Sequence, residues 1–147
     1  MLPRRARRPA ATPRPAPGSR VRHHRAVPPS VPEPTEACPG CGAVLARLGG
    51  DVAAPAGSTP SCARLFEVTL HGLRDEAPAD AAVAAVVRRA DVAYDLQHSP
   101  GHGRRPSAWR MTIADVAADL DVIDLTVLVE AWADAVDDDL TAATSGS

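Results

Sequence analysis

The stretch Ala37-Cys38-Pro39-Gly40-Cys41-Gly42 decides how the rest of the chain is interpreted. It carries two of the three cysteines in a C-x-x-C pattern, and the third, Cys62, follows 21 residues after Cys41. A C-x-x-C turn brings two sulfurs to one metal ion because the short loop folds back, and its glycines permit the positive φ angles that such a turn needs. We therefore predict that Cys38, Cys41 and Cys62 are metal ligands.

Composition indicates one reduced, soluble domain behind a tail. The chain has 147 residues, and all 16 of its basic residues are Arg, which we interpret as the coding bias of a GC-rich bacterium. Three cysteines are an odd number, which favours metal-binding or buried thiols over a disulfide framework. No stretch approaches 18 apolar residues, and the N-terminus lacks the apolar segment of a signal peptide. We expect a cytoplasmic protein without a membrane span.

Charge divides the chain into two parts. Residues 1–35 hold eight Arg and one acid, a net charge of +7, whereas residues 36–147 hold eight Arg and 17 acids, a net charge of −9. The first part also contains nine prolines and too little apolar surface to offset the entropy of ordering. We predict a disordered Arg/Pro-rich tail over 1–35, either merely solvated or an electrostatic arm for nucleic acid.

Apolar periodicity and capping residues predict four helices after the C-x-x-C stretch. Ser58-Thr59-Pro60 is typical of a helix start, and Thr112-Ile113-Ala114-Asp115 resembles a capping box. Residues 43–48 suit a short strand or a turn. The fold class is therefore mainly α: a small helical bundle over 37–143 with a zinc knuckle at its N-terminal side. The helices are expected from about 60 to between Asp75 and Pro78, from Asp80 to His98, from Thr112 onward, and from Asp124 to Ala142.

The last helix carries an unfavourable charge pattern. Asp137, Asp138 and Asp139 lie near its C-terminal end, where the helix dipole disfavours negative charge. We predict that this end frays and that Thr144 to Ser147 are disordered.

Hairpin geometry suggests the fourth metal ligand. If the first two helices pair antiparallel, His98 at the end of the second lies beyond the start of the first, where the C-x-x-C turn must lie. Asp91, Asp95 and His98 share one face of the second helix at i, i+4 and i+7. We predict His98 as the fourth ligand, with Asp95 and His102 as alternatives and Asp95 also able to orient His98. The remaining histidines are expected on the surface or in the tail: His23, His24 and His71.

A thiolate and imidazole donor set favours zinc. With four protein ligands the zinc is structural, and the protein is a binding or adapter module for a protein partner or a small molecule. The alternative is a metal-dependent, hydrolase-like enzyme with an open zinc position and Asp91 as the base on bound water. A weaker alternative is nucleic-acid binding through the basic tail.

Several short motifs resemble a bacterial family named domain of unknown function 5946. The resemblance covers roughly residues 37–140 and depends on the order of the motifs. The sequence differs from the family pattern at Val92, at Arg88 and Arg89, and at the three aspartates near the end of the last helix. The resemblance implies a helical fold with a metal site, but no activity. The motifs are Cys38 to Ala43, Ser58 to Cys62, Tyr94 to His98 followed by Pro100-Gly101, Met111 to Val116, and Leu128 to Ala133.

Overall fold

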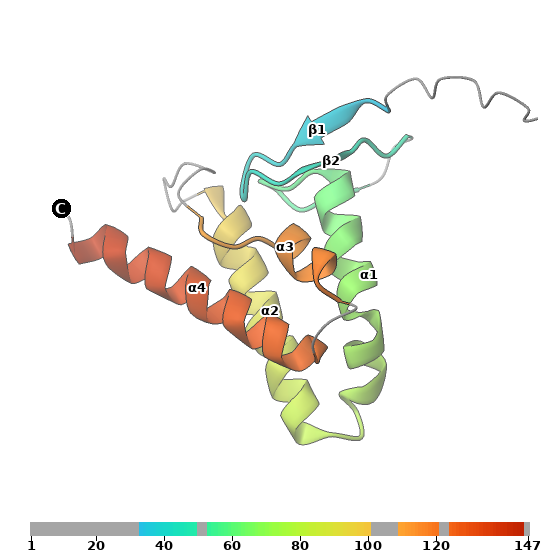
Figure 1. Cartoon of the computed structure of the whole chain (residues 1–147), viewed down its shortest axis with the longest axis vertical. Coiled ribbons are helices and arrows are strands. Elements are labelled where there is room, and N and C mark those ends of the chain that lie inside the picture. The colour runs from blue at the N-terminus through green and yellow to red at the C-terminus, as the bar shows by residue number, and fades with distance from the viewer. Residues whose placement is uncertain (1–32, 50–52, 101–108, 121–123, 146–147) are drawn as a thin grey trace, which may run out of the picture. The chain divides into compact units, whose positions relative to one another are not determined.

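The computed structural model describes residues 33–49, 53–100, 109–120 and 124–145, all within the unit Pro32–Ser147. This unit is mainly α-helical, as predicted (Figure 1). None of its described helices is both long and apolar enough to cross a membrane. In chain order the elements are β1 (Thr35–Ala37), β2 (Val44–Ala46), α1 (Pro60–Glu76), α2 (Ala81–His98), α3 (Ile113–Ala118) and α4 (Leu125–Ser145).

The helix starts follow the capping residues of the sequence. Thr59 precedes Pro60 and its hydroxyl accepts the N–H of Cys62 at 3.3 Å. Asp80 caps α2 in the same way, and Thr112 forms a complete capping box with Asp115 at the start of α3. These side chains accept N–H groups that have no partner within the helix, which fixes where each helix begins.

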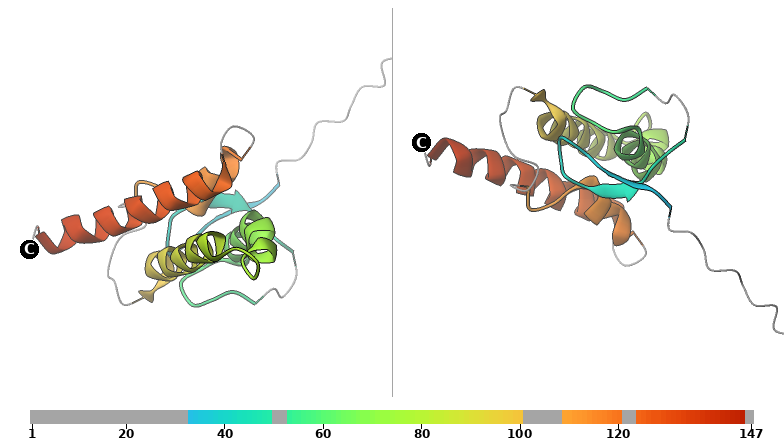
Figure 2. Two further views of the ribbon diagram at one scale, coloured as in Figure 1. Left: turned by 90° about the horizontal axis from the view of Figure 1, so that it is seen from below. Right: turned by 90° about the horizontal axis from the view of Figure 1, so that it is seen from above.

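α2 lies at the centre of the helical layer. Figures 1 and 2 show α1 and α2 as an antiparallel pair joined by a short turn, with α4 packed along α2. α3 packs against α1. The core between these helices is mostly aliphatic, with the rings of Phe66, Tyr94 and Trp132 in contact within it. Its fully buried side chains include Leu70, Ile113, Val116, Val129, Trp132 and Val136.

One buried amide links three segments of this core. Gln97 on α2 donates its Nε2–H to the carbonyl of Met111 at 2.7 Å and accepts the Nε1–H of Trp132 at 3.3 Å. Gln97 is only 3% exposed, so both ends of the amide need these partners. These two hydrogen bonds fix where along α2 both α4 and the segment before α3 make contact.

The strands form a two-stranded antiparallel hairpin over the start of α1. Glu36 pairs with Leu45, while the backbone groups of Ala46 and Leu48 point away from β1. Ser61 in the first turn of α1 hydrogen-bonds to this outer edge of β2. Its Oγ lies 2.8 Å from the Ala46 carbonyl and accepts the Leu48 N–H at 3.1 Å. The same oxygen lies 2.8 Å from the Glu36 carboxylate, so one serine joins both strands to the helix.

Two expectations from the sequence are corrected. Thr35, assigned to the disordered tail, is the first residue of β1, whose three residues carry no alternating pattern that would predict a strand. α4 does not fray at its aspartates but continues to Ser145, so Thr144 and Ser145, predicted to be disordered, are helical. Arg110 donates its backbone N–H and its Nε–H to the buried Asp139 at 2.9 and 2.7 Å, and Arg89 pairs with Asp137 at 3.4 Å. These arginines neutralise the charges that oppose the helix dipole.

Candidate metal centre

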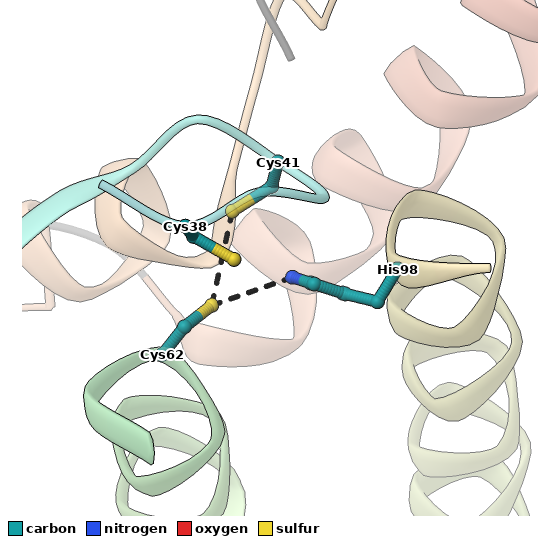
Figure 3. A group of neighbouring side chains, drawn as sticks. All are labelled: Cys38, Cys41, Cys62 and His98. Carbon is teal, nitrogen blue, oxygen red and sulfur yellow. Dashed lines mark hydrogen bonds between the residues drawn. The ribbon is translucent and has the colours of Figure 1, made fainter. Parts of the chain in front are cut away.

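Three cysteines and one histidine meet at the open end of the α1–α2 pair, opposite the turn that joins the two helices. The Sγ atoms of Cys38, Cys41 and Cys62 and a ring nitrogen of His98 all lie within 4.8 Å of one another (Figure 3). The four residues, hereafter the Cys3His cluster, are between 0 and 3% exposed. The structure thus brings together the four residues that the sequence predicts as ligands.

The turn between the strands positions the first two sulfurs. Gly42 adopts φ 81° and donates its N–H to the carbonyl of Cys38 at 2.9 Å, while the Cys38 N–H reaches the Ala43 carbonyl at the same distance. The positive φ is one that glycine adopts without strain. The turn therefore curls Cys38 and Cys41 towards the helices, as Figure 3 shows.

His98 is held in one orientation by its own helix. Its Nδ1 lies 2.7 Å from the Tyr94 carbonyl, which can only accept, so Nδ1 carries the proton. Nε2 faces the sulfurs and lies 3.4 Å from Cys62 Sγ. The ring also stacks on Tyr94 with centroids 4.0 Å apart. Histidines that bind a metal through one ring nitrogen commonly donate the N–H of the other to a backbone carbonyl, as His98 does here.

The spacing of the donor atoms fits one tetrahedral zinc. Zn–S bonds of about 2.3 Å and a Zn–N bond of about 2.0 Å give tetrahedron edges of about 3.8 Å between sulfurs and about 3.5 Å from sulfur to nitrogen. The observed distances are 3.7 Å between Cys41 Sγ and Cys62 Sγ and 3.4 Å between Cys62 Sγ and His98 Nε2. All three cysteines are free thiols, so three sulfur donors are present.

Electrostatics within the cluster also favour a cation. Hydrogen bonds from Cys41 and then Cys62 lower the pKa of the Cys38 thiol, whereas the hydrogen bond to Cys38 raises the pKa of Cys41. Burial by itself lowers the pKa of His98, but hydrogen bonds to Cys38 and Cys62 and to the Tyr94 carbonyl outweigh it and raise the pKa to about 9. The sulfurs therefore attract positive charge, and a divalent cation would stabilise all three thiolates at once.

Two glycines allow backbone from different loops to reach His98. A Cβ on Gly40 would lie 2.6 Å from the Gly57 carbonyl oxygen and 2.7 Å from His98 Cδ2. Gly57 itself has φ 82°, and a Cβ there would collide with the backbone of His98. Trp109 donates its Nε1–H to the Gly40 carbonyl at 3.0 Å. From the sequence, Gly40 is expected to serve the turn alone and Trp109 to lie in the core, where it is 9% exposed.

The acids proposed for the same face of α2 do not join the cluster. Asp95 is exposed, and Asp91 receives both Nη groups of Arg74, the closer at 2.6 Å. His71 is exposed on α1 as predicted, 3.7 Å from Asp75. The remaining histidines lie outside the described residues: His23, His24 and His102. Among the described residues, His98 is thus the fourth member of the cluster.

Comparison of the chain with protein-family models, with curated proteins and with solved structures gives no match. The resemblance to the family named domain of unknown function 5946 therefore stays a prediction.

Proposed function

We propose that the Cys3His cluster binds one Zn²⁺ and that this ion is structural. The observation that carries the proposal is the convergence of four buried donor atoms within 4.8 Å, each on a different part of the turn or the helices. Three thiolates and one imidazole are a complete tetrahedral set, which leaves no coordination position for water or substrate. The ion would join the strand hairpin to the start of α1 and to the end of α2.

A closed site favours a binding or adapter module over an enzyme. In the enzyme alternative, Asp91 acts as a base on metal-bound water, but its carboxylate is engaged by Arg74 at 2.6 Å. Asp95, the other candidate ligand, is exposed and outside the cluster. The metal would therefore hold the hairpin in place while other surfaces of the domain bind the partner.

Three further points belong to the same proposal. A site of three thiolates is maintained in a reducing compartment, so we place the protein in the cytoplasm. Membership of the family named domain of unknown function 5946 would agree with a helical metal-binding fold. Nucleic-acid binding through the Arg-rich segment 1–35 is a separate possibility that predicts an affinity falling steeply with salt.

Metal content measured by elemental mass spectrometry on the purified full-length chain tests the proposal. We expect about one zinc per chain, as a single tetrahedral site holds one ion. Cys41→Ser and His98→Ala should each lower the zinc content and the thermal stability, because each removes one of four ligands. His71→Ala is the matched control, since His71 lies exposed on α1 and should leave both quantities unchanged.

Different outcomes separate the alternatives. Native protein without metal, purified in the absence of chelators, would contradict the central proposal. If His98→Ala kept full zinc occupancy and unchanged stability, the fourth ligand would be another residue or water, and the enzyme alternative would be favoured.

A further inference from the structure

α1 carries apolar side chains on two faces, and only one of them is buried. Its inner face packs into the core through Cys62, Phe66, Leu70 and Leu73. On the opposite side Val68 is 55% exposed. Residues three, four and seven positions from Val68 share its face of the helix. We call this face the outer strip of α1; its residues are Arg64, Leu65, Val68, His71, Gly72 and Asp75.

The N-terminal half of the outer strip forms one wall of an apolar groove. The groove has a volume of about 250 Å³, and β2 with the residues after it forms the other wall. Leu48 on that wall is 40% exposed. The exposed apolar side chains of this groove are available for contact with a partner. The lining residues are Leu45, Ala46, Leu48, Ser61, Arg64, Leu65 and Val68.

The two ends of the outer strip carry opposite charges. Arg64 is the one charged residue that lines the groove, and within the described part of the chain its side chain forms no ion pair. At the other end of the strip Asp75 is 69% exposed. Gly72 between them faces open space, with no atom within 4 Å of an added Cβ. The strip is therefore basic beside the groove and acidic at its far end, where the exposed His71 lies 3.7 Å from Asp75.

We propose that the outer strip binds the outer strip of a second copy of this chain. The two strips would pack antiparallel about a twofold axis near Val68, the self-complementary arrangement of a symmetric dimer. Arg64 precedes Val68 by four residues and Gly72 follows it by four, so Arg64 of one copy lies opposite Gly72 of the other and within reach of its Asp75. Gly72 of each copy would then lie beside the groove of the other, and His71 would lie opposite Leu65.

The pairing works against a net repulsion between copies. Residues 36–147 carry a net charge of −9, so the dimer depends on the two Arg64–Asp75 contacts and on the apolar contact around Val68. The contact is formed by one helix face and one short groove, which corresponds to a small interface and a weak, reversible dimer. The pairing goes beyond the metal proposal and does not depend on which ion the cluster holds.

Sedimentation velocity of the full-length chain at rising concentration tests the dimer. We expect a reversible monomer–dimer equilibrium in the native protein. Val68→Asp should raise the dissociation constant about tenfold or more, since it places a charge at the centre of the contact. Val92→Asp is the matched control, because Val92 on α2 is 56% exposed and lies outside the strip. Circular dichroism and metal content confirm that each variant is folded.

Charge reversal tests the antiparallel arrangement itself. Arg64→Glu and Asp75→Arg should each weaken the dimer, because each creates a like-charge contact across the pair. The double variant Arg64→Glu/Asp75→Arg should restore it, since both contacts are then of opposite sign. A native chain that stays monomeric at every concentration would overturn the proposal. Equal weakening by Val68→Asp and Val92→Asp would do the same, and a double variant as weak as the single ones would overturn the antiparallel geometry.

Discussion

The two ends of the α1–α2 pair are held together by different means. At the turn end a few residues connect the helices, and Asp80 Oδ1 accepts the N–H groups of Ala82 and Val83 at 2.8 and 3.2 Å. At the open end Cys62 and His98 are 36 residues apart and meet in the Cys3His cluster, while Ser58 hydrogen-bonds to Tyr94 at 2.5 Å. Local sequence therefore stabilises the turn end, whereas the open end depends on donors that come from three segments.

This difference explains why the proposed ion would stabilise the hairpin. Each strand has three residues, and Val44 on β2 is 66% exposed, so the hairpin buries little apolar surface of its own. An isolated two-stranded hairpin is marginally stable at best in water. Its polar contacts with the rest of the domain include the Cys3His cluster, the hydroxyl of Ser61 and the indole of Trp109, which precedes α3. The predictions below separate these contributions, beginning with the largest.

Removal of the metal should disorder the open end and spare the turn end. Structural zinc contributes about 10–16 kcal/mol of apparent binding free energy in zinc-finger peptides, comparable to the total stability of many domains. After chelation and desalting, hydrogen exchange followed by mass spectrometry should show faster exchange in residues 35–49 and at Cys62 and His98. The turn over 76–81 and the middle of α4 should keep most of their protection.

The result of this exchange experiment can contradict the comparison in two ways. Uniform loss of protection would mean that the helices also depend on the ion. Unchanged protection throughout would mean that packing alone holds the hairpin.

Trp132→Ala should destabilise the helical core without abolishing metal binding. Trp132 is fully buried on α4, and truncation of a buried indole costs about 3–5 kcal/mol. It also leaves Gln97 Oε1 without its donor. Urea denaturation should show the loss, and protein that is still folded should retain its metal. Val127→Ala is the control, because Val127 is 52% exposed on the same helix and should change stability by less than about 0.5 kcal/mol. Metal loss in folded Trp132→Ala would show that the core and the cluster are not separable.

The positions of the helices and the members of the Cys3His cluster can both be predicted from the sequence, because they depend on residues close together in the chain and on the order of the elements. Thr59-Pro60 and Asp80 are caps, and they place α1 and α2 within a residue or two of their observed bounds. Once the two helices are paired antiparallel, His98 falls beside the C-x-x-C turn. These features follow from short-range periodicity and chain connectivity, which a sequence contains directly.

The features that were missed depend on residues far apart in the chain. The C-terminal end of α4 is stabilised by Arg110 and Arg89, which are 29 and 48 residues from Asp139 and Asp137. β1 forms because β2 pairs with it and because Ser61 reaches Glu36. No local sequence pattern indicates such distant partners. The sequence therefore predicted fraying at the C-terminal end of α4 and disorder at Thr35.

Gly40→Ala should weaken the open end specifically. The added Cβ would lie 2.6 to 2.8 Å from the Gly57 carbonyl, His98 Cδ2 and the Gln97 carbonyl, two of which are backbone atoms that cannot move independently. Relief of this overlap must shift the turn away from His98 and stretch the cluster, with a cost of about 1–3 kcal/mol. Competition with a chromophoric chelator should show faster loss of metal than in the native protein.

Gly49→Ala is the matched control for this substitution. Gly49 follows β2 and has no atom within 4 Å of an added Cβ, so its variant should release metal at the native rate. Equal rates for Gly40→Ala and native protein would show that the close approach of the turn to α2 is not needed for the site.

Ser61→Ala should have the smallest effect on the Cys3His cluster and should leave the metal in place. Ser61 Oγ is the shared partner of the Leu48 N–H, the Ala46 carbonyl and the Glu36 carboxylate, and its removal leaves the free edge of β2 unpaired. Loss of a partner for a buried polar group costs about 1–3 kcal/mol, less than the loss of a metal ligand. The amide of Leu48 should exchange faster, while zinc content stays native. Thr144→Ala, an exposed hydroxyl on α4, is the control and should change neither quantity. If Ser61→Ala lost its zinc, the serine and the ion would form one cooperative unit, and the open end would be held by the hairpin edge as much as by the cluster.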